Sequence, residues 1–125
     1  MVALDASALV ALLFREPGHE RVLDEIDSAC ISSVNVVEVM FRFLREGVGV
    51  DDSAREIARL GIEAVALEPE TACEVATLVA ETRSAGLSLG DCACLALAKA
   101  RGIPALTADR AWAKLDIGVE IELIR

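Results

Sequence analysis

Short apolar runs alternate along the chain with longer segments in which apolar residues recur at helical spacing. The short runs predict buried strands at residues 2–4, 30–33, 62–67, 104–107 and 119–124. The longer segments predict helices at residues 7–15, 18–27, 34–45, 52–60, 70–84, 89–101 and 110–114. Strands that alternate with helices are typical of α/β proteins. We therefore expect a mainly parallel sheet of four to five strands flanked by helices.

The length of the chain limits the number of domains. At 125 residues there is room for one hydrophobic core but not for two. We expect a single domain that spans residues 1–125. Hydrophobic residues make up 54% of the chain, which is a high share for a domain of this size. We therefore expect part of the apolar surface to be covered by a partner, in a homodimer or a complex with a second protein.

The charge of the chain excludes several classes of function. A net charge of −9 is incompatible with the broad basic surface that binds duplex DNA through its phosphates. Chemistry on a nucleic acid would have to be local and bridged by a metal ion. No apolar run reaches the ~18 residues of a membrane span, and Asp5 interrupts the N-terminal run before a signal pattern can form. These features predict a cytoplasmic protein that does not bind membranes.

The four cysteines are expected to be small core residues rather than ligands. Their spacing lacks the two close pairs of a zinc site, and a reducing compartment disfavours disulfides. They are Cys30, Cys73, Cys92 and Cys94.

Four acidic residues are expected to meet at one edge of the sheet. Asp5 follows the first predicted strand, and Glu38 lies near the start of the helix after the second. Asp91 opens the helix that leads to the fourth strand, and Asp109 follows that strand. In a parallel sheet these positions all fall at the carboxyl edge, where open α/β sheets bind their ligands. Neighbouring carboxylates repel each other, and oxygen-only ligands favour Mg²⁺ or Mn²⁺ over zinc.

Three of these acids also have a purely structural interpretation, because aspartate is favoured at helix N-termini. Asp5 and Asp109 each precede a predicted helix and would cap it. Asp91 follows Ser88 by three residues, as in a capping box. The apolar residues that follow Asp91 at helical spacing place its side chain on the buried face of the helix, where a carboxylate needs a partner.

Glu38 has a different alternative. Together with Asn35, Arg42 and Arg45 it forms a polar stripe on the predicted helix 34–45. Glu38 and Arg42 are four residues apart, the spacing of a surface ion pair worth about 0.2–0.5 kcal/mol. The sequence leaves both interpretations of Glu38 open.

The order and spacing of these motifs resemble a PIN-domain ribonuclease, and more narrowly a VapC-type toxin of a type II toxin–antitoxin system. The resemblance spans essentially the whole chain and rests on residues 5–9, 33–38, 87–91 and 106–112. It implies a PIN-like three-layer α/β sandwich. It also implies that Asp5, Glu38, Asp91 and Asp109 are the acidic quartet that binds metal and catalyses the reaction. Ser7 and Thr107 match the positions whose hydroxyl groups support this quartet.

The implied activity is that of a Mg²⁺-dependent endoribonuclease, with Mn²⁺ as a substitute ion, that hydrolyses RNA phosphodiester bonds. Asp5 and Asp91 would hold the ion, Asp109 would complete its surroundings, and Glu38 would position or deprotonate water. The implied partners are a cognate VapB-like antitoxin, an RNA substrate and a second copy of the chain. Cys92 departs from the resemblance, because such toxins often carry a basic residue directly after the third acid.

The remaining basic and aromatic residues have expected places relative to this site. Five basic residues are expected on or near the acidic edge, where they would contact phosphates: Arg15, Arg42, Arg45, Arg110 and Lys114. His19 is expected on the surface, outside the site. Trp112 is expected to anchor the last short helix against the sheet.

Two alternative functions remain open at this point. A Mg²⁺-dependent phosphatase or receiver-type domain would also place an aspartate at the end of its first strand. Such domains need a lysine near the phosphate, whereas Lys99 lies in mid-helix and Lys114 lies away from a predicted strand end. The other alternative is a PIN-like domain that has lost catalysis and serves only in binding or dimerisation.

Overall fold

The computed structural model describes residues 1–125 and contains one five-stranded sheet in the order β3-β2-β1-β4-β5. Every neighbouring pair of strands is parallel. The strands are β1 (Val2–Leu4), β2 (Ala29–Ser32), β3 (Glu63–Val65), β4 (Ala105–Thr107) and β5 (Ile121–Leu123). All five lie at the predicted places, so the expected α/β class and parallel sheet are confirmed.

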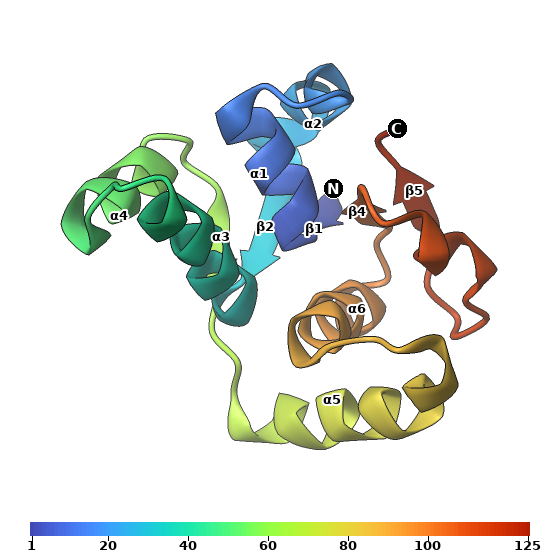
Figure 1. Cartoon of the computed structure of the whole chain (residues 1–125). Coiled ribbons are helices and arrows are strands. Elements are labelled where there is room, and N and C mark those ends of the chain that lie inside the picture. Colours follow the sequence, from blue (N-terminus) through green and yellow to red (C-terminus); the bar gives the residue numbers. More distant parts are fainter.

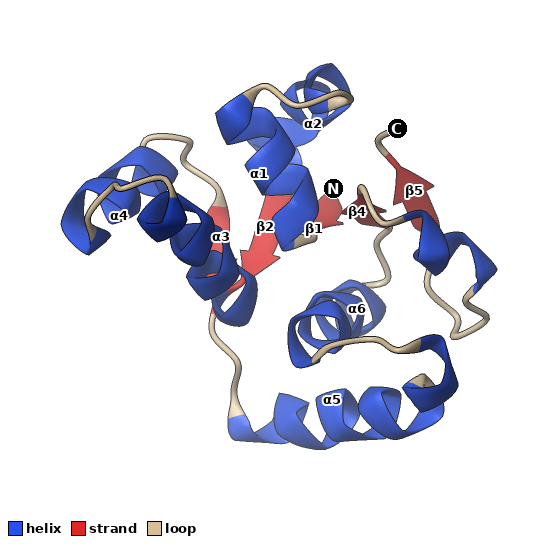
Figure 2. Cartoon of the chain, viewed as in Figure 1, coloured by secondary structure: helices blue, strands red, loops and turns tan.

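Six α-helices and three short 3₁₀ helices connect the strands (Figure 2). The α-helices are α1 (Ala6–Phe14), α2 (His19–Glu25), α3 (Ser33–Arg45), α4 (Val50–Ala58), α5 (Pro69–Glu81) and α6 (Leu89–Arg101). The 3₁₀ helices are η1 (Ile26–Ser28), η2 (Arg83–Ala85) and η3 (Arg110–Lys114). None of the helices combines the length and apolar character that crossing a membrane requires.

The helices cover the two faces of the sheet as separate layers, with α1 to α4 on one side and α5 and α6 on the other (Figure 1). Alternate residues of β1 supply the two cores, because Val2 and Leu4 pack with the first layer and Ala3 packs with the second. The small side chain of Ala3 allows α6 to approach the sheet, and residues 92–98 of α6 are all buried. The predicted three-layer sandwich is confirmed.

Two expectations about buried residues have different outcomes. Trp112 of η3 is fully buried in the core between α6 and the sheet, as expected of an anchor. Three of the cysteines are buried, but Cys73 is exposed. The prediction for Cys73 was wrong because α5 buries the face that carries Val75 and Leu78. A residue two positions before Val75 points about 200° away from it.

The strand order creates a switch point beside β1. From β1 the chain proceeds to β2 and β3 on one side, then crosses to β4 and β5 on the other. Connections therefore diverge from the carboxyl ends of β1 and β4, which is where open α/β sheets bind ligands. Asp5 directly follows β1, and Thr107 is the last residue of β4.

Candidate active site

Asp5 lies at the switch point and is held there by two hydroxyl groups. Its Oδ2 accepts hydrogen bonds from Ser7 Oγ at 2.6 Å and from Thr107 Oγ1 at 2.8 Å. Although Asp5 occupies the N-cap position of α1, its side chain makes no capping bond. The capping interpretation of Asp5 is therefore wrong, while Ser7 and Thr107 do contact its carboxylate.

The two hydroxyl groups are themselves oriented by the turn after β4. Ser7 Oγ accepts from the Ala108 amide at 2.9 Å, and Thr107 Oγ1 accepts from the Asp109 amide at 3.0 Å. A hydroxyl group has one hydrogen to donate. Because each oxygen already accepts an amide hydrogen, its own hydrogen is free to point at Asp5. This network connects the start of α1 to the end of β4 across the switch point.

The carboxylate of Asp5 is in an environment that disfavours its charge. Asp5 is only 4% exposed. Burial is the main cause that raises the pKa of Asp5 from 3.8 to about 6, and the charges of Asp91 and Glu38 raise it further. The hydrogen bonds from Ser7 and Thr107 oppose this shift. Three of the four predicted acids are thus close enough to affect one another electrostatically.

The charge of these acids is not balanced by the protein itself. None of the nine ion pairs in the structure involves Asp5, Glu38, Asp91 or Asp109. A buried carboxylate usually has a cationic partner or binds a metal ion. The edge of the sheet therefore carries negative charge that a bound cation would compensate.

Glu38 faces α6 rather than the basic residues of its own helix. Its Oε2 accepts a hydrogen bond from Asn35 Nδ2 at 2.9 Å. Arg42 pairs with Glu46 at 3.0 Å and with Glu16 at 3.2 Å, so the alternative Glu38–Arg42 surface pair does not form. The Glu38 carboxylate lies against the first turn of α6, where it occupies the space beside Gly90.

Asp91 forms the predicted capping box at the start of α6. The Asp91 amide donates to Ser88 Oγ at 3.1 Å, and Asp91 Oδ2 accepts from the Ser88 amide at 2.8 Å. Asp91 is half-buried, so the expectation that its side chain faces the buried side of the helix holds only in part. Asp91 thus has a structural role and still lies near enough to raise the pKa of Asp5.

The surroundings of Asp109 differ from those of the other three acids. It is exposed and caps η3, with Oδ1 accepting from the Ala111 amide at 3.0 Å. Its own amide donates to Thr107 Oγ1, so Asp109 follows the hydroxyl network directly. The capping interpretation of Asp109 is confirmed, and only Asp91 and Glu38 contribute charge that raises the pKa of Asp5.

All four acids share one feature that bears on metal binding. In each, the hydrogen bonds from the protein fall on a single carboxylate oxygen: Oδ2 of Asp5, Oε2 of Glu38, Oδ2 of Asp91 and Oδ1 of Asp109. The second oxygen of each carboxylate has no hydrogen-bond donor in the protein. No three metal-ligating side chains lie close enough together to hold an ion as they stand. The donor set consists of oxygen alone, which fits Mg²⁺ or Mn²⁺.

The expectation that five basic residues lie near the acidic edge was wrong for three of them. Arg15 follows the last residue of α1, and Arg42 and Arg45 lie in the last turn of α3. Both helices begin at the carboxyl edge, so their C-terminal ends lie toward the opposite edge of the sheet. Arg110 and Lys114 belong to η3, which begins directly after Asp109. Of the five, only these two lie on the element that follows one of the acids.

Sequence reasoning missed one polar residue of the site. The sequence placed Asn35 in a polar stripe and assigned it no role, but its side chain is fully buried between α3 and α6. The three-residue spacing to Glu38 was the available signal, because it places both side chains on one face of the helix. His19 lies at the start of α2 with 29% of its side chain exposed, outside the site as expected.

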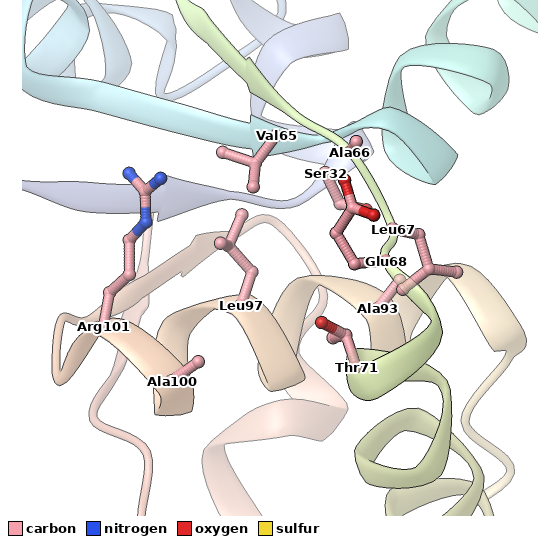
Figure 3. Close-up of a pocket in the computed structure, with 10 residues that line it drawn as sticks. All are labelled: Ser32, Val65, Ala66, Leu67, Glu68, Thr71, Ala93, Leu97, Ala100 and Arg101. Carbon is pink, nitrogen blue, oxygen red and sulfur yellow. The ribbon is translucent and has the colours of Figure 1, made fainter.

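A separate cavity of about 180 Å³ lies between α6, the end of β2 and the segment that follows β3 (Figure 3). Leu97 and Ala93 form its floor on α6, and Glu68 extends over it from the start of α5. Arg101 lines its far end, where it forms an ion pair with Glu63 at 2.6 Å. None of the four acids lines this cavity.

The fold and the sequence both identify the family. The model of the PIN domain family matches residues 2–118. The chain belongs to the PIN domain family. No curated protein matches this PIN domain in sequence.

Several solved structures have the same fold as this PIN domain. DNA-bound VapBC from Salmonella typhimurium is similar with a TM-score of 0.76 and 19% identity, covering 99% of this chain and 98% of that chain. The toxin–antitoxin complex from Klebsiella pneumoniae is similar with a TM-score of 0.73 and 18% identity, covering 100% of this chain and 98% of that chain. VapC20 from Mycobacterium tuberculosis, described as a sarcin-ricin loop cleaving toxin, is similar with a TM-score of 0.74 and 17% identity. The likeness covers 96% of this chain and 99% of that chain. These likenesses extend over nearly the full length of each chain.

Proposed function

We propose that this chain, as a single domain spanning residues 1–125, is a metal-dependent endoribonuclease and the toxin of a type II toxin–antitoxin module. The observation that carries the proposal is the buried carboxylate of Asp5, which has acidic neighbours and no cationic partner at the switch point of the sheet. Membership of the PIN domain family supports nuclease chemistry. The similarity to VapBC and VapC20 structures supports the toxin role.

The acids fit a bound Mg²⁺ or Mn²⁺ in their chemistry. Asp5 and Asp91 would hold the ion through their free oxygens, Asp109 would complete its surroundings, and Glu38 would lie beside it. When bound, such an ion polarises the phosphodiester and makes water a better nucleophile at neutral pH. One oxygen of each acid is hydrogen-bonded within the protein, which leaves the other oxygen free for the ion.

The protein's own groups have separate parts in the proposed hydrolysis. Ser7 and Thr107 keep Asp5 in place by donating to the same oxygen. Glu38 accepts the proton of the attacking water, because it neither caps a helix, as Asp91 and Asp109 do, nor is buried beneath two hydroxyl groups, as Asp5 is. The leaving oxygen takes its proton from solvent, which reaches this edge of the sheet. The expected products carry a 5′-phosphate and a 3′-hydroxyl group.

RNA suits the surface of the protein better than duplex DNA. The net charge of −9 provides no broad basic surface for a duplex. Arg110 directly follows Asp109 and Lys114 ends the same short helix, so these two residues would contact the phosphates that flank the cut. Aromatic residues make up only 3% of the chain, so we expect recognition of RNA shape and backbone rather than base stacking.

The direct test is to map RNA ends after the protein is expressed in cells, with the Asp5→Asn variant as the control. New 5′-phosphorylated ends at defined positions, absent with the variant, would identify both the activity and the substrate. The purified protein should then cut the same RNA in Mg²⁺ but not in EDTA. Equal cleavage by the variant in excess Mg²⁺ would reject the proposed site.

Metal binding is expected to depend on pH. Asp5 has a pKa of about 6, so it is mostly protonated at pH 5 and mostly charged at pH 8. Protons compete with the cation for this carboxylate, and the apparent Kd for Mn²⁺ should rise about tenfold from pH 8 to pH 5. Isothermal titration calorimetry without RNA measures this change. An affinity that is constant over this range would show that Asp5 does not bind the ion.

A homodimer is proposed through the exposed face of α3. Val37, Phe41 and Leu44 are 47%, 57% and 44% exposed and share one side of the helix. Replacing Phe41 with glutamate places a charge in this apolar face and should convert a dimer into a monomer, as measured by light scattering after gel filtration. Leu23→Glu on α2, where Leu23 is 55% exposed, is the matched control and should stay dimeric. A Phe41→Glu variant that remains dimeric would exclude this interface.

A second apolar surface suits the proposed antitoxin. A groove of about 360 Å³ lies between α3, α4 and the edge of the sheet, and all eight residues that line it are hydrophobic. Among them are Val36, Met40 and Ile57. An apolar segment of a partner would fill this groove, and a basic side chain from the same partner would be attracted to the uncompensated acids.

The two alternative functions differ from the proposal in what they require. A phosphatase or receiver-type domain needs a lysine beside the phosphate, but Lys99 lies in the last turn of α6 and Lys114 ends η3. An inert PIN module would bind no divalent cation through its carboxylates. Mn²⁺ titration of the wild-type protein and Asp5→Asn distinguishes this module from a nuclease.

A further inference from the structure

Asn35 connects the helix that carries Glu38 to the helix that carries Asp91. Its side chain is fully buried, and Nδ2 donates to Glu38 Oε2 at 2.9 Å and to the Gly90 carbonyl oxygen at 3.0 Å. These two bonds use both amide hydrogens of Asn35. Asn35 therefore fixes the distance between the Glu38 carboxylate and the first turn of α6.

The chemistry of the contacts determines the orientation of the amide. If the amide were flipped, its oxygen would face a carboxylate and a carbonyl oxygen, which both lack a hydrogen to donate. In the observed orientation, Asn35 Oδ1 is buried without a partner. An unpartnered buried polar atom is unfavourable, and a leucine of similar shape would avoid it. Packing alone thus does not explain an asparagine here, whereas its two donors explain it directly.

A glycine in the first turn of α6 leaves space for the Glu38 carboxylate. A Cβ atom at Gly90 would lie 2.1 Å from Glu38 Oε1 and 2.4 Å from Glu38 Cδ. The absence of a side chain at residue 90 therefore makes room for the carboxylate. The next residue, Asp91, acts with Glu38 in raising the pKa of Asp5.

We propose that Asn35 is a positioning residue, which holds the Glu38 carboxylate against α6 beside Asp91 so that Glu38 can act on the water and the bound cation. This inference rests on the proposed function, because it assigns Asn35 a part in the same site. Asn35 acts only through Glu38, and it needs no contact with the RNA or the ion.

The test is a double-mutant cycle between Asn35→Leu and Glu38→Gln. We expect Asn35→Leu to lower kcat for RNA cleavage about tenfold or more, with KM little changed, because binding of the RNA backbone does not involve Asn35. In the Glu38→Gln background the same replacement should lower kcat by less than about twofold. Calorimetry without RNA should show the same dependence for Mn²⁺ binding. Asn35→Leu should lower the Mn²⁺ affinity of the wild-type protein and change it little in the Glu38→Gln background.

The matched control is Ser53→Ala, at another fully buried polar residue, which removes the hydrogen bond from Ser53 to the Val50 carbonyl oxygen in α4. It should leave cleavage and Mn²⁺ affinity unchanged. If Asn35→Leu fails to fold, Asn35→Ala provides the same comparison. Equal losses from the Asn35 replacement in both backgrounds, or no loss in either, would overturn the inference. A wild-type protein that binds no Mn²⁺ would instead overturn the proposed function itself.

Discussion

Replacing Asp5 with asparagine is expected to abolish RNA cleavage and at the same time to stabilise the metal-free protein. The variant keeps the shape of the side chain and an oxygen that accepts from Ser7 and Thr107, but it removes the charge. Loss of residues that merely support a metal ligand already lowers affinity or activity about 10- to 100-fold, so loss of a ligand should reduce cleavage at least a hundredfold.

The gain in stability follows from the raised pKa of Asp5. The pKa rises from 3.8 to about 6 on folding, so the folded state binds the proton more tightly than the unfolded state. The contribution of Asp5 to the unfolding free energy is therefore fully present below pH 4 and is lost as pH rises through 6. At pH 8 in EDTA the charge costs about 3 kcal/mol, which asparagine avoids.

Denaturant unfolding of the wild-type protein and Asp5→Asn at pH 4 and pH 8 measures this difference. The variant should be more stable at pH 8 and about equal at pH 4. Asp24→Asn, at an exposed aspartate of α2, should change neither cleavage nor stability. An Asp5→Asn variant that is less stable than wild type at pH 8 in EDTA would show that the carboxylate is not under electrostatic strain.

Replacing Gly90 with alanine is expected to impair cleavage while leaving the fold stable. The added Cβ would overlap the Glu38 carboxylate, which lies at the end of a flexible side chain and can move away at small cost. Alanine also favours the helix by about 1 kcal/mol over glycine. Glu38 would lose its place beside Asp91, and loss of a general base lowers rates by about 10²- to 10⁴-fold.

Rates and melting temperatures of Gly90→Ala and Gly49→Ala provide the comparison. Gly49 precedes α4, with nothing within 4 Å of an added Cβ, so its replacement should leave the cleavage rate unchanged and can lower the melting temperature slightly, because alanine is less favourable than glycine at an N-cap. Cleavage by Gly90→Ala should be reduced about as far as by Glu38→Gln. Full activity of Gly90→Ala would mean that the observed position of Glu38 is not the active one.

The positions of the acids could be predicted because they depend on local sequence and on sheet topology. A short apolar run followed by Asp5 marks the end of the first strand, and the Ser88–Asp91 spacing marks the start of α6. In a parallel sheet both places fall at the carboxyl edge. The number and direction of the strands followed from the same alternation of apolar segments.

The contacts between these elements could not be predicted from the sequence, because they join residues far apart in the chain. Thr107 donates to Asp5 across 102 residues, and Asn35 contacts Gly90 across 55. The direction in which a helix side chain points also depends on the packing of its neighbours. For this reason the sequence assigns Asn35 only a place in a polar stripe, and it predicts Cys73, wrongly, to lie in the core.

The most direct test of the account is the anomalous diffraction of crystals soaked in Mn²⁺. We expect a peak at the carboxyl end of β1, about 2.1 Å from oxygens of Asp5 and Asp91, and no peak there in crystals of Asp5→Asn. Data at saturating Mn²⁺ with no ion beside Asp5 and Asp91, or with an ion that persists in the variant, would contradict it.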